Sequence, residues 1–163
     1  MNRDYSVLKG VMNLTTDSYA IRVGTTEIGE SAFVNCEDLR EVFIPESVTC
    51  IGANAFKGLV LLERVIIADN SELIAIDESS FEGCCRLKSI KLPSELQAIE
   101  TKAFMGSGLE SIIIPDQIFS IAPYSFAYCL ELREVLAPKG LSDLSLKAFD
   151  GCERLEIINF KTT

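Results

Sequence analysis

The sequence predicts a solenoid of stacked repeats that consists mainly of short β-strands joined by short helical or 3₁₀ turns. A phenylalanine-centred segment recurs six times, and the intervals between successive phenylalanines are 23, 25, 23, 22 and 23 residues. Apolar residues recur at fixed distances before and after each of them. Such a period is typical of repeats that bury their apolar faces only against one another. The phenylalanines are Phe33, Phe56, Phe81, Phe104, Phe126 and Phe149.

Residues 1–27 match the repeat poorly, and we interpret them as a degenerate first coil or an amino-terminal cap. Tyr19, Ile21 and Val23 alternate with polar residues like a strand. Terminal units of stacked folds are atypical because they have only one neighbour. Residues 28–163 then hold the repeats, with intervals of 22–25 residues, as about six coils of a single domain.

Each repeat contains one half-buried strand after its phenylalanine. A leucine stands six residues after the phenylalanine in five copies, and Leu109 stands one place early. Two apolar positions follow at a spacing of two, which is typical of a strand with one buried face. Stacked strands of this kind predict a parallel main sheet. The two core columns are Val42, Val65, Ile90, Ile112, Val135 and Ile158, and Ile44, Ile67, Leu92, Ile114, Ala137 and Phe160.

The remainder of each repeat reverses the chain. Proline follows the strand in four copies and ends it, because proline has no N–H to donate. A second short strand is expected around residues 48–51 and their equivalents. Glycine stands two residues after four of the phenylalanines and favours one tight helical or 3₁₀ turn. The longest interval holds ADNSEL, residues 68–73, which we interpret as a surface loop because it has too few ligands for calcium.

Residues 32–52 carry the repeat in its fullest form, A-F-x-x-C-x-x-L-x-x-V-x-I-P-x-S-V-x-x-I-G. This pattern resembles the BspA-like class of leucine-rich repeats, and the resemblance covers about residues 28–160. The family implies a leucine-rich-repeat solenoid that acts as a non-enzymatic module for protein–protein interaction or adhesion. Its members are mostly surface or secreted proteins of bacteria and some protists. The family has no catalytic residues to transfer to this chain.

Composition restricts location and partners. Arg3, Asp4 and Lys9 interrupt any apolar signal-peptide core, so a surface or secreted location needs a signal elsewhere, and a cytoplasmic location is the alternative. No apolar run approaches the ~18 residues that a membrane-spanning helix needs, so we expect no membrane insertion. The net charge of −9 argues against binding to nucleic acid. We therefore expect a protein partner.

No catalytic site, metal site or cofactor is expected. The chain has no histidine, so it lacks the commonest general base and a frequent zinc ligand. No glycine-rich phosphate-binding loop is present. Acidic residues are plentiful, and a carboxylate-based hydrolase is the remote alternative.

The six cysteines are expected to be reduced. Four share a column three residues after the phenylalanine, which favours a buried packing position over a metal site. Two of these, Cys129 and Cys152, lie on neighbouring coils, and a disulfide between them is the alternative. Cys50 lies outside the column and is expected to be partly exposed and the more reactive thiol. The column consists of Cys36, Cys84, Cys129 and Cys152.

Two further columns, predicted to face outward from the main sheet, are candidates for a partner-binding surface. The first, the apolar column, lies between the two core columns of the strand, and four of its six members are large and apolar. Coverage by a terminal segment or another copy of the chain is the alternative. The second, the charged column, alternates in sign and predicts a cross-strand ladder that would form the rim. The apolar column is Phe43, Ile66, Lys91, Ile113, Leu136 and Asn159, and the charged column is Arg40, Glu63, Lys88, Glu110, Arg133 and Glu156.

The carboxy-terminal coil is expected to be uncapped, because the sequence stops soon after its sixth predicted strand. Terminal repeats ordinarily need a polar cap for solubility. Two alternatives follow. The chain is a structural segment of a longer array with binding carried elsewhere, or it self-associates through this last coil.

Overall fold

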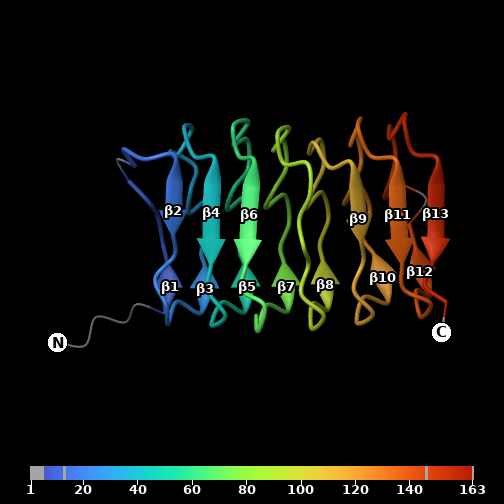
Figure 1. The fold of residues 1–163 in the computed structure, drawn as a ribbon, viewed down its shortest axis with the longest axis horizontal. Coiled ribbons are helices and arrows are strands. Elements are labelled where there is room, and N and C mark those ends of the chain that lie inside the picture. Colours follow the sequence, from blue (N-terminus) through green and yellow to red (C-terminus); the bar gives the residue numbers. More distant parts are fainter. Residues whose placement is uncertain (1–5, 13, 146, 163) are drawn as a thin grey trace.

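The computed structural model describes residues 6–12, 14–145 and 147–162. These residues form a parallel-sheet β-solenoid of about seven turns without helices, which confirms the predicted fold class. Figure 1 shows a row of main strands and a row of short strands along the long axis of the molecule. The first coils, in blue, and the last coils, in red, lie at opposite ends of this axis.

Main strands and short strands alternate along the chain, except at one place described below. The main strands are β2 (Ser18–Ala20), β4 (Glu41–Ile44), β6 (Arg64–Ile67), β9 (Ser111–Ile113), β11 (Glu134–Ala137) and β13 (Ile157–Phe160). The short strands are β1 (Val7–Leu8), β3 (Glu27–Ile28), β5 (Cys50–Ile51), β7 (Ala75–Ile76), β8 (Ala98–Ile99), β10 (Ser120–Ile121) and β12 (Asp143–Leu144). Every pairing between these strands is parallel, as predicted.

Equivalent residues of successive coils lie above one another. Val42 of β4 pairs with Val65 of β6, and Val135 of β11 pairs with Ile158 of β13. Because successive side chains of a strand point to opposite faces, this register places the members of each core column directly above one another. The side chains of β4 and β6 accordingly alternate between buried and more exposed positions.

The six repeat phenylalanines form a continuous stack through the core. Successive ring centroids lie 4.6, 5.1, 5.2, 5.5 and 5.4 Å apart. The two rings of each pair are stacked, with interplanar angles between 3° and 19°. Tyr19 packs edge-on against Phe33, with centroids 5.4 Å apart, at the amino-terminal end. The ring spacing is close to the ~4.8 Å between neighbouring strands, so the strand repeat and the ring stack are compatible.

The segment around each phenylalanine is a series of tight turns with single i→i+3 hydrogen bonds, such as that from the N–H of Val34 to the carbonyl of Ser31 at 3.1 Å, and no continuous helix is formed there. The N–H of Phe33 donates to the carbonyl of Ala55 at 3.0 Å, and that of Phe56 donates to the carbonyl of Ser80 at 2.8 Å. Both acceptors lie in the next coil, whereas a helix uses such groups within one segment. Ser31 also has a φ of 54°, which interrupts a right-handed helix. The turns therefore form a third hydrogen-bonded row.

The cysteine column links neighbouring coils. The thiols of Cys84, Cys129 and Cys152 each donate to the carbonyl oxygen of the repeat phenylalanine in the preceding coil, at 3.2, 3.1 and 3.0 Å. All six cysteines are free thiols in the structure. The column is therefore a hydrogen-bond donor position as well as the packing position that the sequence indicated.

Residues 6–12 and 14–27 continue the solenoid at its amino-terminal end. Strands β1 and β2 pair with β3 and β4. The N–H of Val11 donates to the carbonyl of Ala32 at 2.8 Å, and that of Ile21 donates to the carbonyl of Phe43 at 2.9 Å. Val23 lies beyond the end of β2 and is exposed, so it does not continue the strand.

Both rows of strands are interrupted near the middle of the molecule (Figure 1). Residues 88–92 lie between β6 and β9 in the sequence, where a main strand is expected, and form none. The row of short strands stops between β8 and β10. The row of turns continues across the same coils, since the N–H of Phe81 donates to Ala103 and that of Phe104 donates to Ser125, both at 2.7 Å. The stack is thus held together along its turns where its sheets are interrupted.

Candidate functional site

The apolar column lies on the outer face of the main row. Phe43, Ile66 and Ile113 are 43%, 39% and 61% exposed, whereas the residues beside them in their strands are buried or polar. Leu136 is half-buried. These side chains are large and apolar and reach solvent from a preformed sheet.

The interruption of the sheet divides the apolar column into two clusters. Phe43 pairs with Ile66 in neighbouring strands. Leu136 pairs with Ile113 on one side and with Asn159, an exposed residue, on the other. The sixth member of the column, exposed Lys91, lies in the segment that forms no strand.

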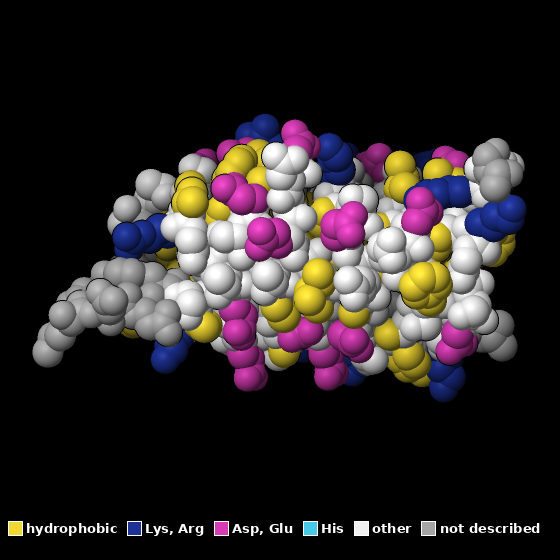
Figure 2. Space-filling view, turned by 90° about the horizontal axis from the view of Figure 1, so that it is seen from below, with side chains coloured by type: hydrophobic (Ala, Val, Ile, Leu, Met, Phe, Trp, Pro, Cys, Tyr) yellow, Lys and Arg dark blue, Asp and Glu magenta, His cyan; other side chains and the backbone are white. Residues whose placement is uncertain are grey.

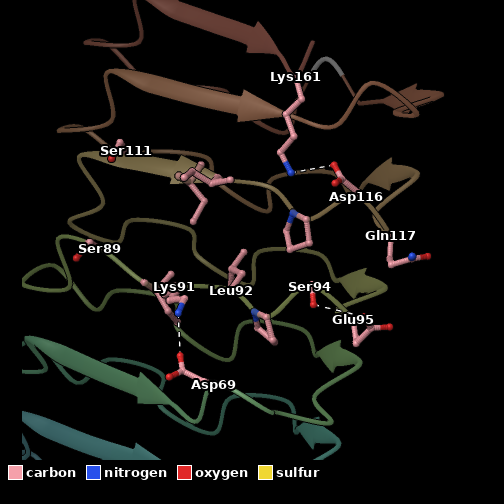
Figure 3. Close-up of a pocket in the computed structure, with 15 residues that line it drawn as sticks. Asp69, Ser89, Lys91, Leu92, Ser94, Glu95, Ser111, Asp116, Gln117 and Lys161 are labelled. Carbon is pink, nitrogen blue, oxygen red and sulfur yellow. Dashed lines mark hydrogen bonds and ion pairs between the residues drawn. The ribbon is translucent and has the colours of Figure 1, made fainter. Parts of the chain in front are cut away.

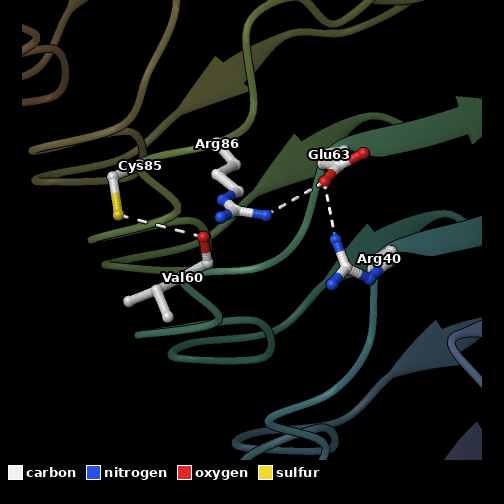
Figure 4. A network of polar contacts seen from close by, with 5 residues as sticks. All are labelled: Arg40, Val60, Glu63, Cys85 and Arg86. Atoms are coloured by element: carbon white, nitrogen blue, oxygen red, sulfur yellow. Dashed lines mark hydrogen bonds and ion pairs between the residues drawn. The ribbon is translucent and has the colours of Figure 1, made fainter.

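The charged column forms part of the expected ladder. Arg40 Nη1 lies 2.9 Å from Glu63 Oε1, and Lys88 Nζ lies 3.1 Å from Glu110 Oε1. The expected pairing of Glu63 with Lys88 is wrong, because Arg86 Nη1 contacts Glu63 instead, at 3.3 Å (Figure 4). Lys88 belongs to the segment that does not pair with β6, so the regular spacing that the alternation requires is missing there.

The carboxy-terminal part of the charged column lacks ion pairs among the described residues. Among the described residues, Arg133 and Glu156 take part in no salt bridge. Exposed ion pairs each contribute only ~0–1 kcal/mol of stability. The ion pairs of this column therefore contribute little to stability.

A groove of about 730 Å³ lies where the main sheet is interrupted (Figure 3). It is lined by residues 89–95, 111–113 and 115–117, together with Asp69 and Lys161. Two members of the apolar column, Lys91 and Ile113, belong to this lining. A volume of this size is within the range of ~300–1,000 Å³ that is usual for ligand sites.

Two ion pairs flank the groove. Lys91 Nζ donates to Asp69 Oδ1 at 2.8 Å, and Lys161 Nζ donates to Asp116 Oδ1 at 2.8 Å. The hydrogen bond and the charge of Lys91 lower the pKa of the Asp69 carboxyl group. Figure 3 shows the two pairs on opposite sides of Leu92. Lys161 comes from the end of β13, so residues distant in the sequence meet at this groove.

Two features of the sequence accompany the groove, although neither predicted it. The repeat that supplies residues 111–113 and 115–117 of the lining is one residue short, and its Leu109 stands one place early. In the structure, Gly108 passes so close to the preceding coil that a Cβ atom there would lie 2.2 Å from the carbonyl oxygen of Cys85. Coil lengths are therefore unequal on the two sides of the interruption.

Cys50 is partly exposed, as expected, but its surroundings disfavour the reactive thiolate form. Burial and the neighbouring Asp77 carboxylate raise the pKa of Cys50 to about 12. Cys50 Sγ lies 3.5 Å from Asp77 Oδ2. The thiolate is the reactive form of cysteine, so this environment suppresses reaction. Cys85 is the cysteine whose side chain is exposed.

The described residues contain no cluster of three or more acidic, cysteine or histidine side chains that could hold a metal ion. No helix in the described residues has the length and apolar character needed to cross a membrane.

A family model described as a BspA type leucine rich repeat region with six copies matches residues 11–129 and, in an overlapping match, residues 61–163. The chain belongs to the BspA-type leucine-rich repeat family. Leucine-rich repeats commonly serve as protein-interaction or surface modules and are typically non-enzymatic. No curated protein matches the chain.

Crystal structures of bacterial leucine-rich repeat proteins resemble this member of the family. One from Bacteroides ovatus is 27% identical over 97% of the chain, with a TM-score of 0.77. A leucine rich cell surface protein from Faecalibacterium prausnitzii is 25% identical over 89% of the chain, with a TM-score of 0.74. One from T. pallidum is 27% identical over 88% of the chain, with a TM-score of 0.76. The chain covers 44%, 48% and 69% of these proteins, so it spans less than half the length of the first two.

Proposed function

We propose that this BspA-type repeat domain is a non-enzymatic protein-binding module of the adhesion type, which binds its partner through the outer face of the main row. The observation that supports this most directly is the exposure of Phe43, Ile66 and Ile113 on a rigid sheet. The core of an interface needs large apolar side chains that lose water on binding. A preformed sheet presents them at little entropic cost. The charged column then forms the rim and adjusts association rate and orientation.

A binding experiment with two matched variants tests this proposal. Wild-type protein and a Phe43→Asp, Ile66→Asp variant are each used to capture proteins from a panel of purified cell-surface and extracellular-matrix proteins. Both substituted residues lie outside the groove. The control is a Val34→Asp, Leu130→Asp variant, whose substituted residues are 55% and 51% exposed in turns rather than in the main sheet. We expect the first variant to lose the partner and the control to keep it. Equal capture by all three proteins would place the binding site on another face.

The same proposal includes display outside the cell. The relative from Faecalibacterium prausnitzii is described as a cell surface protein, which favours that location over the cytoplasm. An antibody against the folded domain should label intact source cells as strongly as permeabilised ones. Labelling that requires permeabilisation would contradict surface display.

A second candidate function, a structural segment of a longer repeat array, is favoured by the exposed side chains of β13. Ile158 and Phe160 are 37% and 53% exposed, whereas Val135 and Ala137 in the same columns are 0% and 1% exposed. A following coil or a second copy of the chain would cover them. Light scattering over a range of concentrations tests for a second copy. Self-association that Ile158→Asp abolishes supports a second copy, and a monomeric wild type contradicts it.

A further inference from the structure

We propose that the groove at the interrupted main sheet binds an extended peptide segment, which pairs through its backbone with residues 89–92. The peptide would also place a lysine or arginine side chain beside Glu95. This inference rests on the proposed protein-binding function and names the chemistry of one part of the partner.

The first argument is the backbone of residues 89–92. In the part of the chain that the structure describes, neither the N–H nor the C=O groups of these residues form a hydrogen bond. Their side chains nevertheless alternate as in a strand, with Ser89 and Lys91 exposed and Ile90 buried. By contrast, β11 is paired on both sides, with β9 and with β13. The segment thus has the side-chain pattern of a strand and lacks its partners.

Backbone groups without a protein partner at an open groove are left to water, and a ligand that pairs with them replaces that water with direct hydrogen bonds. Another extended backbone supplies donors and acceptors at the spacing of a strand, which is the basis of recognition by strand addition. The groove offers room beside the segment, with a volume of about 730 Å³. Its lining combines apolar Leu92, Ile113 and Pro115 with serines, so it offers contacts to both apolar and polar side chains of a peptide.

The second argument is charge. The two lysines of the groove are already paired with Asp69 and Asp116. Glu95 accepts a hydrogen bond from Ser94 Oγ at 3.3 Å and has no cationic partner among the described residues. Figure 2 views the edge of the solenoid toward which the main strands point, and Asp and Glu side chains lie across its middle and along its lower margin, while Lys and Arg lie at its margins. A cationic peptide complements this face and the net charge of −9.

The test uses the whole chain and four synthetic peptides of about six residues, the usual length of a strand. The first alternates threonine and valine around a central lysine, and the second replaces that lysine with glutamate. The third carries N-methyl groups on alternate amides, which removes donors and keeps the side chains. The fourth replaces two valines of the first with proline, which lacks an N–H and interrupts a strand. Binding is followed by the NMR shifts of backbone amides on titration.

Two variants at one position separate backbone pairing from side-chain contact. Lys91→Pro removes an N–H that donates to no group in the structure, so the fold keeps its hydrogen bonds while strand addition is blocked. Lys91→Ala removes the exposed side chain and keeps the N–H. Melting curves of both variants establish that they are folded. If Lys91→Pro is unfolded, the N-methylated peptide on the wild type provides the same comparison.

We expect the lysine peptide to shift the amides of residues 89–92 and to bind more tightly than the glutamate peptide. Lys91→Pro or peptide N-methylation should weaken binding by about tenfold or more, equivalent to ~1.4 kcal/mol, and Lys91→Ala, which keeps the N–H, should weaken it less than Lys91→Pro does. Shifts confined to residues outside the groove, equal binding of the N-methylated peptide, or no binding by any of the four would overturn the inference. The capture experiment with Phe43→Asp, Ile66→Asp does not involve residues 89–92 or Glu95, so it tests the proposed protein-binding function separately.

Discussion

The thiol of Cys84 donates a hydrogen bond to the backbone carbonyl oxygen of Phe56, 3.2 Å away in the preceding coil. Cys84 is fully buried, and burial raises the pKa of its thiol to about 12. The thiol therefore keeps the proton that it donates at neutral pH. This bond adds a side-chain link between coils to the links made by the backbone.

Replacing Cys84 with alanine should lower the free energy of unfolding by about 1–2 kcal/mol, because it removes a buried hydrogen bond and leaves a small cavity. Cys85→Ala is the matched control, since that side chain is exposed and its loss should change stability by less than ~0.5 kcal/mol. Urea denaturation of the two variants measures the difference. Losses of equal size would show that the thiol bond contributes nothing measurable.

Phe104→Ala should cost ~3–5 kcal/mol of unfolding free energy, as is usual for a buried aromatic residue. Phe104 is completely buried and stacks between Phe81 and Phe126, at centroid distances of 5.2 and 5.5 Å. Phe43→Ala should cost far less because Phe43 is 43% exposed on the outer face. Chemical denaturation of both variants checks this. A similar loss at Phe43 would mean that its side chain is covered in solution.

Gly151→Ala should destabilise the protein more than Gly58→Ala. Both glycines have positive φ, 72° and 75°, so either substitution strains the backbone by ~1–2 kcal/mol. A Cβ atom at position 151 would also lie 2.5 Å from the ring of Tyr128, whereas at position 58 it would meet nothing within 4 Å. Thermal melting of the two variants gives the order. Adding Tyr128→Gly should remove the excess loss of Gly151→Ala, and failure to do so would exclude the ring contact as its cause.

Cys50 should resist thiol reagents in the folded protein. Its pKa is raised from 9.0 to about 12, so at about pH 9 the folded thiol stays protonated while the unfolded thiol is partly ionised. The contribution of the Cys50 thiol to the free energy of unfolding is therefore complete below about pH 9. It decreases as the pH rises toward 12, because unfolding then releases a proton. Alkylation of the wild type at about pH 8, followed by mass mapping of the peptide that contains Cys50, should show this thiol reacting much faster in urea than in buffer. Equal rates would contradict the protecting environment of Cys50.

The backbone amides of residues 89–92 should exchange with deuterium much faster than those of Glu134 to Leu136. The former donate to no group in the described structure, whereas β11 is paired on both sides. Exchange of wild-type protein followed by NMR tests this without any substitution. Protection of residues 89–92 at the level of β11 would mean that the main sheet is continuous in solution.

The sequence by itself determined the solenoid and most of its columns. An interval near 23 residues gives the coil, and the alternation around Val42 and Ile44 shows which side chains face inward. These properties are present within each repeat, and stacking places equivalent residues in register. The outward position of Phe43 and Ile66 could therefore be predicted. The buried cysteine column could be predicted for the same reason.

Only the tertiary structure decided what depends on the spacing between coils. The N–H of Phe33 points to the next coil rather than back along its own turn, so the turns form a hydrogen-bonded row between coils. Arg86, and not Lys88, reaches Glu63, and residues 89–92 lack strand partners where neighbouring repeats differ in length. A hydrogen bond between strands depends on a separation of ~4.8 Å. That separation is set jointly by two coils and by all the rows that join them, which no single repeat encodes.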